Sequence, residues 1–129
     1  MEEAVKLSKI HQVAVYAKDL DEACKFYRDT LGARFIAQYG QDLLFFDFSG
    51  TRILLEKAGR PATLYFWVDD IEAAHRELVS KGVVFDSDPH VIHRDDDGTF
   101  GVKGNAEWMA FFKDPSDNII ALATQRSPT

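Results

Sequence analysis

The chain has 129 residues, of which 46% are hydrophobic and 28% are charged, and its formal net charge is −6. This length and composition are typical of one globular domain, and no apolar run reaches the ~18 residues of a membrane-spanning helix. The acidic balance argues against nucleic acid as a partner. The single cysteine, Cys24, excludes an internal disulfide, and the charged N-terminus does not resemble a secretory signal, so we expect a cytoplasmic protein without a membrane partner.

The first half of the chain is predicted to start with a strand and a helix. Residues 10–17 alternate and are rich in β-branched side chains, which indicates a strand. Asp19 is expected to cap the following helix, with Glu22 completing a capping box, and Gly32 is expected to end it. Turn sequences then separate three further predicted strands, at about 33–39, 42–48 and 52–57.

The second half repeats this layout after a joint at 57–61. Asp70 and Ala74 follow Asp19 and Ala23 at the same offset of 51 positions, which indicates a duplicated unit. The predicted elements are a strand at 63–68, a helix at about 70–81, a strand at about 83–86 or a little beyond, and strands at about 106–112 and 118–124. Two β-α-β-β-β units predict one α+β domain spanning 1–129, with module one at about 8–58 and module two at about 62–126.

A long polar segment, residues 94–105, interrupts the second unit. A connection of this length in a compact domain is expected to be either functional or mobile. The run from Asp95 to Gly98 resembles the start of a calcium loop, but Gly104 stands where the bidentate Glu is required. We therefore interpret it as a solvated acidic loop. Residues 114–118 form a strong turn signal before the last strand.

Three segments resemble signatures of the vicinal-oxygen-chelate superfamily, which includes glyoxalase, extradiol dioxygenases, methylmalonyl-CoA epimerase, and bleomycin and fosfomycin resistance proteins. They are Ala17 to Gly32, Val68 to Ala73, and Phe111 to Ile120. The resemblance implies two modules whose curved sheets enclose a cleft, with the helices on the outer faces. It is specific for the fold and not for the activity, because members share the scaffold and differ in the cavity.

The resemblance also implies where a metal cofactor would be held. Members that use a metal place four ligands in the cleft, and the corresponding positions here are Gln12, Glu56 (or Leu54), Thr63 and Ala121. This set offers one carboxylate and no imidazole, which makes a poor divalent site. We expect either no cofactor or a divalent metal held by Gln12 and Glu56.

Alternation along the predicted strands gives a set of candidate substrate-binding residues on the cleft faces. They are Gln12, Arg52, Glu56, Thr63, Tyr65 and Trp67. Aromatic walls with a few polar groups suit a small-molecule pocket. In the alternative interpretation Tyr65 and Trp67 belong to the core, and Arg52 and Glu56 are paired or solvated at a strand edge. His11 is expected to face the helix side, because neighbours on a strand point to opposite faces.

Two histidines before the long loop are further candidates. His90 and His93 would point to opposite faces of a regular strand, and only a turn or helix would bring them together. The segments that hold this pair and Trp108 resemble parts of glyoxalase-like proteins of unassigned function, so these three residues join the substrate-binding candidates. Ordinary exposed or capping histidines are the alternative. His75 and Cys24 fall on the helix stripes and are expected to be structural.

These observations leave three functional hypotheses, and no pattern identifies a catalytic residue. The first is a metal-poor cleft protein that binds a small organic molecule, similar to the drug-sequestering resistance proteins. The second is a glyoxalase- or dioxygenase-like enzyme with an unusual ligand set drawn from Gln12, Glu56, His90 and His93. The third is a structural or regulatory interaction domain. We also expect a homodimer, because family members commonly pair and aromatic-rich strands need cover.

Overall fold

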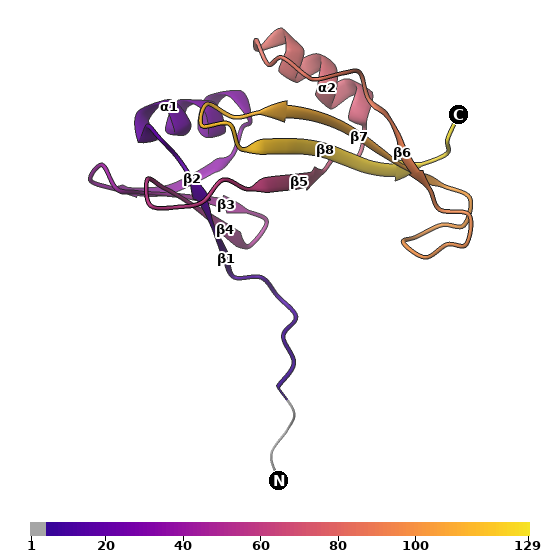
Figure 1. Cartoon of the computed structure of the whole chain (residues 1–129), viewed down its shortest axis with the longest axis horizontal. Coiled ribbons are helices and arrows are strands. Elements are labelled where there is room, and N and C mark those ends of the chain that lie inside the picture. Colours follow the sequence, from indigo (N-terminus) through magenta and orange to yellow (C-terminus); the bar gives the residue numbers. More distant parts are fainter. Residues whose placement is uncertain (1–4) are drawn as a thin grey trace.

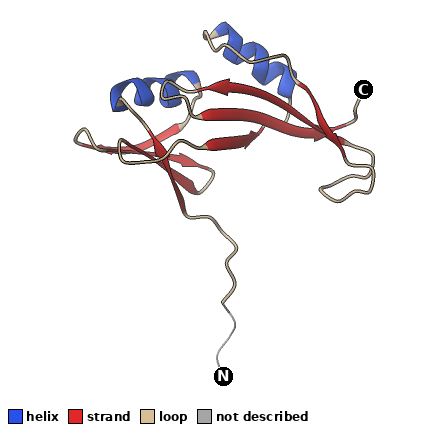
Figure 2. Ribbon diagram, viewed as in Figure 1, coloured by secondary structure: helices blue, strands red, loops and turns tan. Residues whose placement is uncertain are grey.

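The computed structural model describes residues 5–129 and contains two four-stranded sheets, each covered on one side by a helix (Figures 1 and 2). In chain order the elements are β1 (Gln12–Tyr16), α1 (Leu20–Lys25), a π-helical turn (Phe26–Thr30), β2 (Arg34–Tyr39), β3 (Leu43–Phe48), β4 (Thr51–Glu56), β5 (Thr63–Trp67), α2 (Ile71–Ser80), β6 (His90–Arg94), β7 (Ala106–Lys113) and β8 (Ile119–Arg126). The strand orders are β1-β4-β3-β2 in module one and β5-β8-β7-β6 in module two. The predicted α+β architecture of two tandem βαβββ modules is confirmed.

Both helices begin at the aspartates that the sequence predicts. The side chains of Asp19 and Asp70 each accept a hydrogen bond of 3.0 Å from the backbone N–H three residues later, which satisfies one of the free donors of a helix start. The first helix is shorter than predicted. It widens into a π-helical turn in which the Leu31 N–H donates to the carbonyl oxygen of Phe26 at 2.9 Å. The spacing of apolar residues does not distinguish this wider turn from a regular one.

The core lies between each helix and its sheet. In module one it includes Val15, Tyr27, Phe46 and Leu55, and in module two Ile71, Phe112, Ile120 and Leu122, all of them buried. Three partly buried side chains, Phe26, Leu31 and Leu64, pack against both clusters. Among residues 5–129 no helix covers the opposite face of either sheet, and alternate strand residues point to that face. We call it the open face of the module. Figure 1 shows both helices on the same side of the molecule.

In each module the edge strand farthest from β1 or β5 carries a β-bulge; these strands are β2 and β6. The register shifts between Phe35 and Ala37 in β2 and between Val91 and His93 in β6. The intervening residues, Ile36 and Ile92, are exposed. A bulge bends its strand and increases the local twist, so the two modules curve at equivalent places.

The turn at 114–118 joins the modules through buried polar groups. The Tyr27 hydroxyl donates to Asp114 Oδ2 at 2.7 Å, and the Asn118 amide donates to the Tyr16 carbonyl oxygen at 2.6 Å. Asp114, Ser116 and Asn118 are buried. Burial, and then the charge and hydrogen bond of Asp114, raise the pKa of Tyr27 far above its ordinary value, so this phenol stays protonated.

One predicted strand begins later in the chain than residues 83–86. Residues 83–86 form no strand; Phe85 makes a single bridge to Phe112. Val83 and Phe85 reach the core of module two from a loop, so their apolar character reflects packing and not strand pairing. The strand that pairs with β7 on the side away from β8 is β6, which begins at His90.

Among residues 5–129 the two sheets share no strand pairing and do not close on each other. No helix in this range is long and apolar enough to cross a membrane.

Candidate functional site

The open face of module two is built from rows of cross-strand partners. These rows are Tyr65–Ala121–Phe111, Trp67–Ala123–Met109–His90, and Gln125–Glu107–His93. Directly opposed residues in a sheet place their side chains on the same face. The first two rows are largely aromatic or apolar, and the third is polar. Tyr65 and Trp67 are 58% and 59% exposed, so they are not core residues, in contrast to the alternative interpretation of the sequence.

The β-bulge in β6 brings the two histidines to one face. His90 lies opposite Met109 and His93 lies opposite Glu107. Since Met109 and Glu107 are two residues apart, their side chains share a face. This corrects the expectation that a strand would separate the two rings, because the bulge at Ile92 absorbs the extra residue. His90 Nδ1 lies 2.9 Å from the carbonyl oxygen of Asp88.

A pocket of about 420 Å³ lies at the end of this face, beside the 95–105 loop. We call it the end pocket. Its lining consists of Ile92, His93, Asp95, Phe100, Asn105, Ala106, Glu107, Met109 and Gln125. The volume is in the range of small-molecule sites. In Figure 1 this loop is the orange segment that joins β6 to β7, at the far end of module two from α1.

Asp95 organises the loop that closes the end pocket. This buried carboxylate accepts hydrogen bonds from the backbone N–H groups of Thr99 at 2.8 Å and Phe100 at 2.9 Å. Burial disfavours its charge, but the N–H groups of Phe100, Thr99 and Gly101 outweigh burial and hold the pKa of Asp95 below its ordinary value. The loop therefore has a defined structure, and it places Phe100 edge-on to His93 with ring centroids 6.0 Å apart.

The open face of module one carries a charged row at one end. Arg52 Nε donates to Gln12 Oε1 at 3.0 Å, and a second guanidinium nitrogen lies 3.0 Å from His11 Nε2. The expectation that His11 faces the helix side is therefore corrected. His11 precedes the first residue of β1, so strand alternation does not fix its direction.

The metal positions implied by the family resemblance do not form a metal site. Gln12 lies opposite Arg52, whereas Glu56 lies opposite Tyr16 at the other end of the same strand pair. Four residues of strand place their Cα atoms about 13 Å apart along the strand, and Gln12 Oε1 accepts a hydrogen bond from the cationic Arg52, so the two side chains do not converge on one ion. Within residues 5–129 no group of three or more His, Cys, Asp or Glu side chains could hold a metal. The donor set does not fit a divalent ion.

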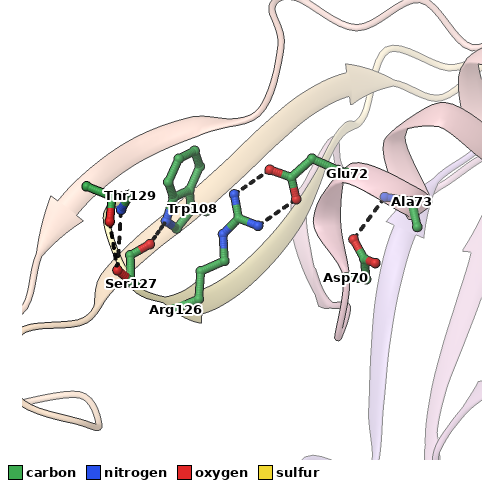
Figure 3. Close-up of polar contacts among 7 residues, drawn as sticks. All are labelled: Asp70, Glu72, Ala73, Trp108, Arg126, Ser127 and Thr129. Atoms are coloured by element: carbon green, nitrogen blue, oxygen red, sulfur yellow. Dashed lines mark hydrogen bonds and ion pairs between the residues drawn. The ribbon is translucent and has the colours of Figure 1, made fainter.

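Trp108 lies on the helix-facing side of module two, away from Tyr65 and Trp67. The Arg126 guanidinium stacks 4.2 Å from the centre of its ring and forms a bidentate ion pair with Glu72 of α2 (Figure 3). The indole N–H of Trp108 donates to the Ser127 carbonyl oxygen at 3.1 Å. Trp108 precedes Met109 on β7, and adjacent strand residues point to opposite faces. It therefore does not line the same face as the other candidates.

Sequence reasoning missed Glu107, Met109, Phe111, Gln125 and Phe100. Glu107, Met109 and Phe111 fall on the strand predicted at 106–112, and alternation relative to its buried neighbours would have placed them with Tyr65 and Trp67. Gln125 lies just beyond the strand predicted at 118–124, because β8 continues to Arg126. Phe100 could not be found in this way, because its position depends on the hydrogen bonds of Asp95.

A second hollow of about 600 Å³ lies between the modules on the helix side. The ion pairs Arg34–Asp47 at 3.8 Å and Glu77–Lys81 at 3.7 Å neutralise the charges at its rim, and its floor consists of core side chains such as Phe112 and Ile120. We interpret it as the seam between the two modules.

The chain belongs to the Glyoxalase/Bleomycin resistance protein/Dioxygenase superfamily, whose family model matches residues 9–122. The sequence resemblance is thus confirmed. No curated protein matches the chain.

Solved structures share the fold at low sequence identity. A lactoylglutathione lyase from Agrobacterium tumefaciens is 20% identical, with a TM-score of 0.72 over 92% of this chain and 94% of that one. A protein from the mobile metagenome of V. Pseudocholerae is 23% identical, with a TM-score of 0.75 over 95% and 98%. TnmS3, an antibiotic binding protein from Streptomyces sp. CB03234, is 23% identical, with a TM-score of 0.71 over 98% and 100%.

Proposed function

We propose that this protein binds a small organic molecule on the open face of module two. The apolar body of the ligand lies against Tyr65, Trp67 and Phe111, and one end reaches the end pocket. The observation that carries this proposal is the end pocket itself, because Met109, which lines it, lies in the same cross-strand row as the half-exposed Trp67. Such a combination of apolar walls and a few polar groups is typical of small-molecule sites. The antibiotic-binding neighbour agrees with this proposal at the level of the fold.

A second copy of the chain completes the proposed cleft. Tyr39 on module one is 63% exposed, comparable to Tyr65 and Trp67 on module two. The sheet edges formed by β1 and β5 have no strand partner within residues 5–129. Exposed edges and aromatic faces favour association. We therefore propose a homodimer in which modules one (about 8–58) and two (about 62–126) of different copies face each other across the ligand.

The mismatch of the metal positions favours binding over metal-dependent lyase or dioxygenase chemistry. Both of those reactions rely on an ion to polarise substrate oxygens, whereas Gln12 is hydrogen-bonded to Arg52 and Glu56 lies at the other end of the same strand pair. In our proposal the protein holds its ligand without a metal. Its single thiol, Cys24, is buried and free, which suits a reducing compartment, and we propose that the protein acts in the cytoplasm.

The two tryptophans report on opposite faces of module two and provide the test. The Trp67 indole N–H donates to Asp69 at 2.9 Å on the open face, and the Trp108 indole N–H donates to Ser127 on the helix side. The chain would be ¹⁵N-labelled and titrated with 2-(1-naphthyl)ethanol, a neutral aromatic probe, with Trp67→Phe and Trp108→Phe used to assign the two indole signals. We expect a saturable shift of the Trp67 signal and a constant Trp108 signal. Movement of Trp108 alone, or of neither signal, would contradict the proposal.

A further inference from the structure

Carboxylates line the end pocket, and no lysine or arginine balances them there. Its lining includes the carboxylates of Asp95 and Glu107 and contains no Lys or Arg. Arg94 and Lys103 flank the pocket in the sequence but do not line it. A pocket with mostly apolar walls and a negative potential attracts a cation more strongly than a neutral molecule of the same shape.

The two carboxylates differ in their availability to a ligand. Both oxygens of Asp95 accept hydrogen bonds from the loop backbone, at 2.8 Å and 2.9 Å. Glu107 is different. Throughout the described part of the chain, no ion pair includes it, and its cross-strand neighbours are His93 and Gln125. Glu107 therefore presents a carboxylate that can accept from a ligand.

The neighbours of Glu107 extend the set of acceptors. His93 and Gln125 share its face and line the same pocket, and each can present an acceptor, a neutral imidazole nitrogen or an amide oxygen. An ammonium group has several N–H donors and no acceptor. Ile92, Phe100 and Met109 line the rest of the pocket and suit the apolar body that carries this group.

We propose that the end pocket selects ligands that carry a cationic nitrogen on an apolar, aromatic body, and that Glu107 is the residue that determines this preference. This inference rests on the proposed function, because it names the class of molecule held at the same site. It assigns the ligand's ammonium group to Glu107, with His93 and Gln125 on either side, and the ligand's rings to the aromatic rows.

Three probes with the same naphthalene ring would separate charge from shape. They are 2-(1-naphthyl)ethylamine, 2-(1-naphthyl)ethanol and 1-naphthylacetate, which are cationic, neutral and anionic at neutral pH. Affinities would be measured by calorimetry at low salt on the full chain. The chain has two methionines, so a methyl-¹³C methionine label, assigned with Met109→Leu, locates each probe at the pocket. We expect the amine to bind about tenfold more tightly than the alcohol and the acetate to bind most weakly.

The matched variants are Glu107→Gln and Asp97→Asn, which remove one negative charge each. Asp97 is exposed and does not line the pocket. Glu107→Gln should lower the affinity for the amine about five- to tenfold and leave the affinity for the alcohol within about twofold. Asp97→Asn should leave both affinities nearly unchanged.

Each outcome has a distinct meaning. Equal binding of amine and alcohol to the wild-type chain, or an equal loss of both in Glu107→Gln, would overturn the cation preference while the proposed site stands. If none of the three probes shifts the Met109 methyl signal, the proposed function itself fails. The wild-type comparison needs no variant, so the inference remains testable even if Glu107→Gln does not fold.

Discussion

Tyr27 and Asp114 form a buried hydrogen bond that crosses between the two modules. Asp114 also accepts from the backbone N–H groups of Ser116 and Asn118, both at 2.9 Å. Tyr27 thus links the helix layer of module one to a turn whose conformation Asp114 fixes. Leaving a buried carboxylate without a hydrogen-bond partner costs more free energy than the same hydrogen bond contributes at an exposed site.

We expect Tyr27→Phe to lower the free energy of unfolding by about 1–2 kcal/mol, because Asp114 loses a hydrogen bond in a buried site. Urea denaturation followed by circular dichroism measures the difference. Tyr39→Phe is the control, since Tyr39 is exposed and its hydroxyl has no hydrogen-bond partner within residues 5–129; its effect should lie within about 0.5 kcal/mol. Equal stability of Tyr27→Phe and wild type would show that the link contributes nothing.

At the scale of elements, the 95–105 loop depends on a single carboxylate. The pKa of Asp95 is lower in the folded chain than in the unfolded chain, because the backbone N–H groups that it accepts from outweigh its burial. A group with a depressed folded pKa stabilises the fold above its unfolded pKa of about 3.9, and this contribution disappears as the pH falls through the lower folded value.

We therefore expect Asp95→Asn to be less stable than wild type at neutral pH, with the difference shrinking as the pH falls below about 4. The measurement is the urea midpoint of both proteins across this range. Asp96→Asn, at an exposed neighbour, should show no comparable pH-dependent difference. A gap between wild type and Asp95→Asn that is constant with pH would contradict the role assigned to the ionised carboxylate.

Local sequence patterns were sufficient to predict the two modules, the order of their elements, and the side of the strand on which most side chains lie. The repeated layout around Asp19 and Asp70 predicted two βαβββ units, and alternation put Thr63, Tyr65 and Trp67 on one face of a strand, where all three are exposed. These features depend on neighbours in the chain, so periodicity reveals them.

Features that depend on distant contacts could not be predicted. The bulge that unites His90 and His93 depends on how β6 pairs with β7. The direction of His11 depends on Arg52, which is 41 positions away in the chain. Trp108 became a candidate because its segment resembles one in glyoxalase-like proteins. Its side chain points to the opposite face of β7 from Met109 and contacts Arg126, which is paired with Glu72.

At the scale of the whole molecule, the open faces and free strand edges lead us to expect a dimer. Sedimentation velocity at micromolar concentration should give a species of twice the chain mass of 14.6 kDa. Replacing both Tyr65 and Trp67 with Ser should weaken this association, because it removes exposed aromatic area. A wild-type chain that sediments as a monomer at these concentrations would contradict the proposed dimer.

Gln12 and Glu56, two of the positions where family members hold a metal, lie at opposite ends of the β1–β4 pair, and this leads to a further prediction. Protein purified without added ions, and protein incubated with Zn²⁺, Ni²⁺ or Mn²⁺ and then desalted, should retain far less than one ion per chain by elemental analysis. Glu56→Ala should not change the result, because Glu56 and Gln12 lie at opposite ends of the strand pair and Gln12 is hydrogen-bonded to Arg52. One tightly held ion per chain that is lost in Glu56→Ala would overturn this interpretation and favour the enzyme hypothesis.

The central claim is that the open face of module two binds an organic ligand, and one NMR titration tests it most directly. Chain labelled with ¹⁵N and at the methionine methyl groups would be titrated with 2-(1-naphthyl)ethylamine while the Met109 methyl and the Trp108 indole signals are followed together. We expect a saturable shift at Met109, which lines the end pocket, with no change at Trp108 on the opposite face. A Met109 signal that stays fixed up to the solubility limit of the probe would contradict the claim.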